Sequence, residues 1–431
     1  MLDSKKVAFF TLGCKLNYSE SSTIGFDLIK KGYEIVDFEA SPDIFIINTC
    51  SVTDFADQKN RKIIRKAKKI NPNGKVVVIG CYAQLKPDEI EKIEGVDLIL
   101  GAKEKFKVAD HLTEDANKIF SCQVEDVQDF HHSFSFGERT RSFLKIQTGC
   151  DYICTYCTIP MARGKSRSGD PNEIVRNAEM IAAKGIKEIV LTGVNIGDYG
   201  KGLDGDEKNF HYLLKLLDKV DGIERIRISS IEPNLLTNDI IELVAESEKI
   251  VPHFHIPLQS GSDKILQLMK RRYLTPLYKD RIEMVKRILP HAGIGVDVIV
   301  GFPGENEKEF IETYNFLESL DISYLHVFTF SERTGTPAAI MPEKVPFRIR
   351  KDRNELLTKL SDTKRRVFNS SFINSTRKVL AEKPVSGSFY SGFTDNYIKV
   401  RFNSETDVEN KIVNIHLQKI NDKNDLTGII V

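Results

Sequence analysis

Three cysteines in one short segment specify a chemistry more directly than any other residues of this sequence. Cys150, Cys154 and Cys157 lie in GCDYICTYCTIPMARG with the spacing C-x3-C-x2-C. Three thiolates on one loop can hold three irons of a [4Fe–4S] cube and leave the fourth iron open to a small molecule. Structural zinc sites use four ligands and paired C-x2-4-C spacings, so zinc fits poorly. Because the three lie so close together, we prefer this iron–sulfur site to three unrelated core cysteines.

A second set of three cysteines is spread along the first third of the chain. Cys14, Cys50 and Cys81 each follow an apolar run that is typical of a buried parallel strand. In open α/β sheets, ligands bind outside the carboxyl ends of the strands. We therefore expect these thiols to gather at one edge and to form a second cluster site with an open iron. The alternative is three unrelated small residues at strand ends.

An open iron can be chelated by the amino and carboxylate groups of S-adenosylmethionine. One electron from the cluster then cleaves the sulfonium and yields a 5′-deoxyadenosyl radical, which the protein must orient and shield. Polar residues after the later predicted strands could hold the rest of the cofactor, although each alone is more often a cap or turn residue. The candidate cofactor contacts are Tyr156, Asn195, Ser230, Glu232, Gln259 and Asp297.

The elements that must position these residues fall into three predicted domains. Residues 1–135 alternate apolar runs with helical patterns and predict an α/β domain with a doubly wound parallel sheet. Its predicted strands are Val7–Leu12, Ile44–Asn48, Val76–Gly80 and Val96–Leu100, and its predicted helices include Ser21–Lys31 and Asp54–Ile70. The segment Phe134–Arg141 is typical of a linker.

Residues 136–366 predict six β/α units, and therefore a barrel that is either complete or open. The chemistry of such barrels lies on the loops after the strands, and the C-x3-C-x2-C loop follows the first predicted strand. The predicted strands are Phe143–Gln147, Ile189–Thr192, Ile226–Ser229, Phe254–Pro257, Gly295–Val300 and Tyr324–Phe330. The predicted helices include Ile174–Lys184, Phe210–Val220, Leu277–Ile288 and Phe347–Arg366.

Residues 367–431 predict a small antiparallel β-barrel, because short apolar segments alternate with Gly, Ser and Asn turns. Two basic stretches elsewhere, Gln58–Ile70 and Phe347–Arg366, offer a surface for RNA phosphates, although a solvated helix face is an equally good interpretation of Gln58–Ile70. The candidate RNA contacts are Arg61, Arg65, Lys69, Arg365 and Arg366. Aromatic residues of the predicted barrel could stack on bases; they are Phe389, Tyr390, Phe393, Tyr397 and Phe402.

Composition places the chain among ordinary globular proteins. Its 431 residues are 41% hydrophobic and 29% charged, and the net charge of +1 points to no particular partner. No apolar run reaches the roughly 18 residues of a membrane span, and the first residues show no signal-peptide pattern. We expect a cytoplasmic monomer with no membrane contact, in a reducing compartment where cysteines serve as metal ligands or in catalysis rather than in disulfides.

Several motifs together resemble the radical S-adenosylmethionine methylthiotransferases over essentially the whole chain. Three segments are similar to the cluster-binding N-terminal domain of that family; they are TLGCKLN, NTCSVT and VIGCYAQ. Six later segments are similar to the family's radical domain; they are GCDYICTYCTIPMARGKSRS, LTGVNIGDYG, SSIEP, HIPLQSGSD, MKRR and VIVGFPGE. The tail resembles the family's small RNA-binding barrel, known as a TRAM domain. The resemblance implies two [4Fe–4S] clusters and S-adenosylmethionine as cofactors.

The family has three main branches, and the residues after the first cysteine help to separate them. One branch modifies isopentenyladenosine in tRNA, one a ribosomal-protein aspartate, and one N6-threonylcarbamoyladenosine in tRNA. Cys14-Lys15-Leu16-Asn17 resembles the third branch, as do GVNIGDYG and HVFTFSERTGTPAA, whereas Tyr18 stands where that branch commonly has Gln. The implied target is the modified adenosine beside the anticodon, and the implied partner is the anticodon stem-loop of tRNA.

The resemblance also implies a division of labour between the two triads. The cluster on Cys14, Cys50 and Cys81 would carry a sulfur that one S-adenosylmethionine methylates. The other cluster would generate the radical that takes hydrogen from C2 of the adenosine, and an electron donor such as flavodoxin or ferredoxin would supply the electron. The alternatives are methylthiolation of isopentenyladenosine or of a ribosomal-protein aspartate, and a non-enzymatic iron–sulfur RNA-binding or sensor protein.

Overall fold

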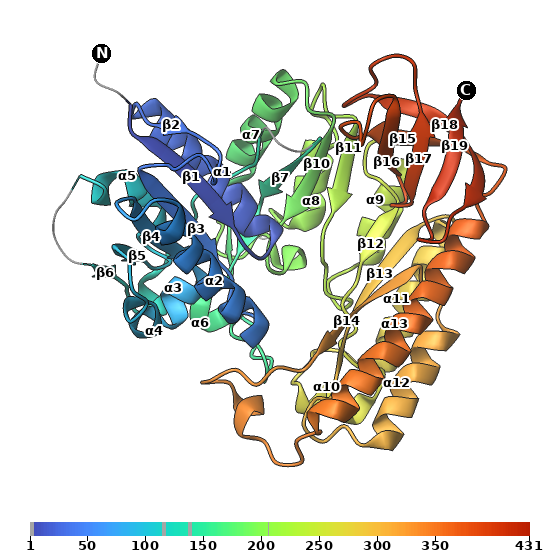
Figure 1. Cartoon of the computed structure of the whole chain (residues 1–431). Coiled ribbons are helices and arrows are strands. Elements are labelled where there is room, and N and C mark those ends of the chain that lie inside the picture. The colour runs from blue at the N-terminus through green and yellow to red at the C-terminus, as the bar shows by residue number, and fades with distance from the viewer. Residues whose placement is uncertain (1–3, 114–117, 137–139, 206) are drawn as a thin grey trace.

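The computed structural model describes residues 4–113, 118–136, 140–205 and 207–431. A parallel sheet, an open barrel and a small closed barrel follow one another along the chain (Figure 1). Among the described residues, no helix is both long and apolar enough to cross a lipid bilayer. The predicted linker Phe134–Arg141 lies partly outside the described residues, and its Phe134 pairs with Leu144 in an antiparallel bridge.

The N-terminal sheet is parallel and has the strand order β2-β1-β3-β4-β5-β6 within the described residues. Its strands are β1 (Lys6–Thr11), β2 (Glu34–Ile35), β3 (Ile44–Thr49), β4 (Lys75–Gly80), β5 (Leu98–Leu100) and β6 (Ile119–Phe120). Its helices are α1 (Lys15–Lys30), α2 (Asp54–Ile70), α3 (Cys81–Leu85), α4 (Pro87–Glu91) and α5 (Val108–His111).

Helices cover both faces of this sheet, as a doubly wound fold requires. Along β3, Ile44 and Ile46 pack in the core that contains Leu28 of α1. Phe45 and Ile47 pack in the opposite core, which contains Ile64 of α2. Successive side chains of a strand point to opposite faces, so an uninterrupted apolar run is what such a doubly covered strand needs.

The central part is an open barrel of six parallel strands. β7, β10 and β11 form one sheet and β12, β13 and β14 another, and the parallel bridges Ile226–Ile250 and Ser230–His255 join them. The strands are β7 (Arg141–Lys145), β10 (Glu188–Thr192), β11 (Arg225–Ile228), β12 (His253–His255), β13 (Gly293–Val300) and β14 (Tyr324–Thr329). The short strands β8 (Gln147–Thr148) and β9 (Arg167–Ser168) form a separate antiparallel pair.

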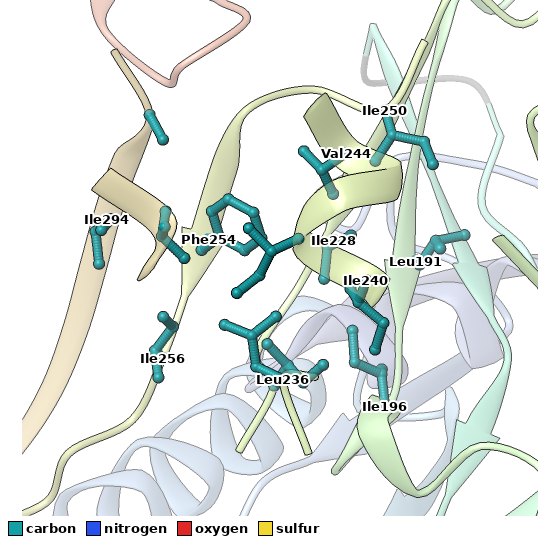
Figure 2. Close-up of a cluster of buried hydrophobic side chains, with 14 of the residues drawn as sticks. Leu191, Ile196, Ile228, Leu236, Ile240, Val244, Ile250, Phe254, Ile256 and Ile294 are labelled. Carbon is teal, nitrogen blue, oxygen red and sulfur yellow. The ribbon is translucent and has the colours of Figure 1, made fainter. Parts of the chain in front are cut away.

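Helices pack against the outer face of this barrel and bury its largest core. Figure 2 shows Leu191, Ile228, Phe254 and Ile294, from four successive strands, in one buried cluster with Ile240 of α9. Each side chain of this kind contributes roughly 1.5–3 kcal/mol when it is fully buried. The helices are α6 (Ile159–Arg163), α7 (Pro171–Ala183), α8 (Phe210–Leu217), α9 (Asn238–Glu246), α10 (Asp263–Leu268), α11 (Thr275–Ile288), α12 (Glu307–Ser319) and α13 (Phe347–Ser370).

The C-terminal strands close into a barrel with the order β15-β16-β17-β19-β18. The strands are β15 (Thr376–Ala381), β16 (Phe389–Thr394), β17 (Lys399–Asn403), β18 (Ile412–Ile420) and β19 (Leu426–Ile430). All pairs are antiparallel except β17 with β19, which are parallel. The barrel docks on the central part through Arg225 and Arg227, whose guanidinium groups donate to backbone carbonyls of Phe393 and Asp395.

Candidate active site between two cysteine triads

Cys150, Cys154 and Cys157 lie on the loop between β8 and α6, as predicted. The backbone N–H groups of Tyr152 and Ile159 point at the sulfurs of Cys150 and Cys157, each at 3.4 Å. Gly149, which precedes the loop, has φ +75°, and a Cβ at this position would lie 1.9 Å from the carbonyl oxygen of Lys165. Only glycine fits there, so the sharp entry into the loop is built into its sequence.

Burial keeps these thiols protonated when no metal is near. Desolvation raises the pKa of Cys150 to about 11 and that of Cys157 to about 12. The thiol of Cys154 raises both values further, so the three sulfurs lie within reach of one another. Thiolates bind metals, and a metal deprotonates the thiols that coordinate it. Three buried thiols with N–H donors around them therefore fit a thiolate-held cluster.

The other triad forms where three neighbouring strands of the N-terminal sheet end. Cys14 precedes α1, Cys50 follows β3 and Cys81 begins α3. Burial raises the pKa of Cys50 to about 12, and the thiols of Cys81 and Cys14 add to this rise. Gly13 has φ +98°, and a Cβ there would lie 2.7 Å from the Cβ of Cys50, so the chain of Cys14 passes directly against Cys50.

A pocket of about 240 Å³ borders Cys157 of one triad and the segment that follows Cys50 of the other. Val52 and Thr53, directly after Cys50, form one wall, and Cys157 with Tyr156 forms another. Further lining residues come from the barrel strands and their loops, and Thr158, Ile159 and Ser331 complete the lining; the barrel residues are Gln259, Asp297, Ile299, Phe328, Thr329 and Phe330. A molecule in this pocket therefore contacts segments that belong to both cysteine sites.

Of the predicted cofactor contacts, Tyr156, Gln259 and Asp297 line this pocket beside Cys157. The side chain of Ser230 lies outside that lining, with its Oγ 2.5 Å from Nδ1 of His255. Asn195 also lies outside the lining of this pocket. It is buried and donates through Nδ2 to Asp198 at 3.1 Å.

Glu232 contributes to the site through a residue that sequence reasoning assigned no role. Arg271 donates to Sγ of Cys154 at 3.1 Å and forms an ion pair with Glu232. Burial raises the pKa of Glu232, and Arg271 opposes that rise. The arginine lies in the MKRR segment, but no spacing rule connects it with a cysteine 117 positions earlier.

A buried cluster of charged side chains connects the segments that carry the two triads. Glu20 of α1 is fully buried and contacts Arg163 at 2.9 Å, Lys105 at 2.7 Å and Lys145 at 3.3 Å. Arg163 also donates to the side-chain oxygen of Asn17 at 2.6 Å. Since α6 begins two residues after Cys157, this arginine links the C-x3-C-x2-C loop to the first turns of α1. Burial lowers the pKa of Lys105 and that of Lys145, the latter to about 7, whereas Arg163 keeps its charge. The positive charge of Arg163 favours an anionic thiolate cluster nearby.

The predicted RNA contacts lie on helices α2 and α13 and differ in their surroundings. Arg65, Lys69 and Arg366 are exposed, whereas Arg61 donates to the hydroxyl of Tyr82 at 3.2 Å. Arg365 is half-buried, with its guanidinium 5.6 Å from the centroid of the Tyr324 ring. The basic side chains of α2 are thus partly exposed to solvent and partly bonded within the N-terminal domain.

The idea that all five barrel aromatics are open for stacking is wrong for four of them. Tyr390 and Phe402 are buried in the barrel core. Phe393 and Tyr397 stack on each other with ring centroids 4.7 Å apart, and Tyr397 also stacks on His253 of the central part. Tyr390, Phe393 and Phe402 are oriented by strand alternation and Tyr397 by the turn between β16 and β17, and the turn pattern of the sequence does not reveal which side chains face the core or the docking surface.

Comparison with known proteins agrees with the fold described above and with the family that the sequence motifs resemble. Residues 144–317 match the Radical SAM superfamily, and residues 6–101 match the Uncharacterized protein family UPF0004. The threonylcarbamoyladenosine tRNA methylthiotransferase MtaB of Bacillus subtilis is 42% identical, over 96% of this chain and 94% of the relative. The tRNA-2-methylthio-N(6)-dimethylallyladenosine synthase of Clostridium novyi is 34% identical, over 99% of this chain and 97% of the relative.

Among solved structures, the radical S-adenosylmethionine methyltransferase TsrM of Kitasatospora setae has a similar fold. With tryptophan and an S-adenosylmethionine analogue bound, it superposes with a TM-score of 0.59 at 14% identity. The match covers 78% of this chain and 75% of TsrM. At this identity the similarity concerns the fold alone, and it agrees with the open barrel and the parallel sheet described above.

Proposed function

Because the chain belongs to the radical S-adenosylmethionine methylthiotransferases that act on tRNA, we propose that it adds a methylthio group to C2 of N6-threonylcarbamoyladenosine beside the anticodon. The chain is an enzyme that uses S-adenosylmethionine and a [4Fe–4S] cluster, and its substrate is tRNA. The non-enzymatic alternative is set aside, since the relatives named above are enzymes.

One observation carries the proposal of two clusters: the same pocket borders Cys157 and the segment that follows Cys50. A radical formed at one site has to act on a carbon that also meets the sulfur at the other. A C2–H bond of adenine is not acidic, so proton transfer by a side chain would not activate it. When bound, one cluster with S-adenosylmethionine supplies the radical, and a second cluster supplies the sulfur.

In this scheme the residues of the chain bind and orient the clusters, S-adenosylmethionine and the target base. Cys150, Cys154 and Cys157 hold one cluster, and Arg271 keeps a positive charge against the sulfur of Cys154. Gln259 and Asp297 line the pocket in which S-adenosylmethionine and the target base meet. The aromatic and aliphatic side chains of the lining limit the access of water to a reactive radical. Tyr156 and Phe330 belong to that lining.

The test is methylthiolation of an anticodon stem-loop RNA by the anaerobically reconstituted protein. With N6-threonylcarbamoyladenosine in the RNA, mass spectrometry of the nucleosides should detect the 2-methylthio product. The same RNA carrying isopentenyladenosine serves as the matched control and should react poorly. Product from the control RNA alone would overturn the proposed substrate.

Two cysteine variants separate the roles of the triads. Cys150→Ala should abolish formation of 5′-deoxyadenosine. Cys50→Ala should still permit cleavage of S-adenosylmethionine and yet give no methylthio product. Sulfur transfer that survives Cys50→Ala would contradict the division of labour between the two sites.

A further inference from the structure

The C-x3-C-x2-C loop borders two different hollows of the molecule. Cys157 lines the pocket described above, whereas Cys150 lines a second hollow of about 840 Å³, which we call the Cys150 recess. Cys154 is buried. A cluster held by the three thiolates therefore has one ligand on the pocket and another on the Cys150 recess. The proposed function gives this second side of the loop no role.

The lining of the Cys150 recess is largely apolar and includes the cysteine loop itself. Ile153 lies between Cys150 and Cys154 in the sequence and is 70% exposed. The other apolar or aromatic lining residues are Val124, Val127, Tyr152 and Pro160. An exposed apolar patch with a polar rim is typical of surfaces that contact another protein. The recess is therefore suited to a protein partner that reaches the loop.

Three cations surround this apolar patch. Lys165 lines the recess and is exposed. Arg167 also lines it and donates to the backbone carbonyl of Lys165 at 2.9 Å. Arg272 is exposed, donates to the backbone carbonyl of Asp151 at 3.2 Å, and has its guanidinium 3.9 Å from the centroid of the Tyr152 ring. Among the described residues, none of these three cations forms an ion pair, so their charges stay uncompensated.

Carboxylates on the same surface are fewer or already paired. Asp151 forms an ion pair with Lys201 at 3.2 Å, and the buried Asp198 shares that lysine at 3.0 Å. Glu125 lines the recess and is exposed, and no ion pair engages it in the part of the chain that the structure describes. Positive charge is thus in excess around the recess. Exposed charges of one sign steer a partner of the opposite sign.

We infer that the Cys150 recess is the docking surface of an acidic one-electron carrier protein that reduces the radical-generating cluster. This inference rests on the proposed function, in which S-adenosylmethionine and the target base fill the pocket beside Cys157. The Cys150 side is then the route left for the electron. In this step the carrier loses one electron and the cluster gains it, and no bond forms or breaks.

An acidic protein fits this surface better than RNA does. The phosphates of RNA would also be attracted by Lys165 and Arg272, but they gain nothing from Ile153 and the apolar lining. Complexes of electron-transfer proteins bury small interfaces, typically below about 1,200 Å² in total, so a recess and its rim can supply the contact. The surface thus joins an apolar centre beside a cluster ligand to a positively charged rim.

Formation of 5′-deoxyadenosine with two different reductants tests the docking surface. The assay is anaerobic and contains no RNA, so that RNA binding does not enter. The probes are reduced flavodoxin, an acidic one-electron carrier, and excess dithionite, a small ion that needs no docking surface. Lys165→Glu should lower the rate with flavodoxin about ten-fold at low ionic strength, because a steering cation is reversed. The difference should shrink as salt is added.

A second variant tests the apolar centre of the surface. Ile153→Asp should also lower the rate with flavodoxin, because it places a carboxylate where the acidic partner makes contact. Both variants should keep the wild-type rate with dithionite. The matched control is Lys308→Glu, because Lys308 is an exposed lysine of α12 outside the recess. It should leave the rates with both reductants unchanged.

Three results would overturn the inference. Lys165→Glu and Ile153→Asp could both leave the rate with flavodoxin unchanged, or they could lower the rates with both reductants equally. Lys165→Glu could instead raise the Kd for tRNA and leave the rate with flavodoxin unchanged, which would assign the recess to RNA. Failure of the proposed function appears separately, as wild-type protein that forms 5′-deoxyadenosine but yields no methylthio product from the modified RNA.

Discussion

Replacing Glu20 by Gln should destabilise the folded protein more than any single change of a surface charge. Glu20 is fully buried, and Arg163, Lys105 and Lys145 lie within 3.3 Å of its carboxylate. Burial alone would raise the pKa of Glu20, but Arg163 and the two lysines hold it well below its usual range. The variant leaves the permanently charged Arg163 buried without this countercharge, whereas burial lowers the pKa of Lys105 and that of Lys145, the latter to about 7, so both lysines lose their protons more readily.

The size of the effect follows from this arrangement. Breaking a buried ion pair by removing one partner costs about 3–5 kcal/mol, because the remaining charge stays buried and uncompensated. Proteins have only about 5–15 kcal/mol of stability in total, so Glu20→Gln should remove a large share of it. Glu20 also joins the N-terminal sheet to the central barrel, since Lys145 and Arg163 belong to the latter.

The assay is urea unfolding of the purified protein followed by far-ultraviolet circular dichroism, because the chain has no tryptophan to report by fluorescence. Glu173→Gln is the matched control, since Glu173 pairs with Arg176 on the exposed face of α7. Surface pairs contribute about 0–1 kcal/mol, so the control should unfold close to the wild type. Equal unfolding midpoints for Glu20→Gln and Glu173→Gln would refute the reasoning.

Three further changes probe the site, the pH dependence and the RNA surface. Arg271→Met should slow formation of 5′-deoxyadenosine about ten- to a hundred-fold, because Cys154 loses a charged hydrogen-bond donor; an unchanged rate would remove Arg271 from the site. Burial raises the pKa of Glu305 to about 7 from an ordinary 4.5, so between these pH values the folded protein binds one proton more than the unfolded chain. The free energy of unfolding should therefore fall by on the order of 3 kcal/mol as the pH rises through this range. Glu305→Gln should flatten that fall in unfolding experiments from pH 4.5 to 7.5, and a slope equal to the wild type would contradict the assignment. Charge reversal at the exposed Arg65 and Lys69 should raise the Kd for tRNA and reduce its salt dependence; unchanged binding would show that α2 lies outside the RNA interface.

Much of the fold was predictable because its signals are local. The apolar runs before Cys14, Cys50 and Cys81 are the parallel strands β1, β3 and β4, and the basic helix was predicted with its observed bounds, Asp54–Ile70. Thr53 accepts from the N–H of Ala56 and caps that helix, and a threonine before a helical pattern is a readable start signal. Strands of two residues, such as β2 and β6, carry no periodicity and were not predicted.

The candidate site was less predictable, because its supporting contacts join residues far apart in sequence. Glu20 and Arg163 are 143 positions apart, and Arg271 reaches Cys154 across 117. No periodic pattern encodes such pairs; they follow from how the barrel and the sheet dock. The roles of the six cysteines as cluster ligands, and of Asp297 and Gln259 as cofactor contacts, remain predictions that the geometry supports.

The most direct test of the central claim, two clusters on two triads, is quantification of iron and sulfide in anaerobically reconstituted protein. The wild type should contain about eight irons and eight sulfides per chain. A variant with Cys14, Cys50 and Cys81 replaced by Ala should retain about four of each, and so should a variant with Cys150, Cys154 and Cys157 replaced. About four irons in the wild type, with no loss when the first triad is replaced, would contradict the two-cluster account.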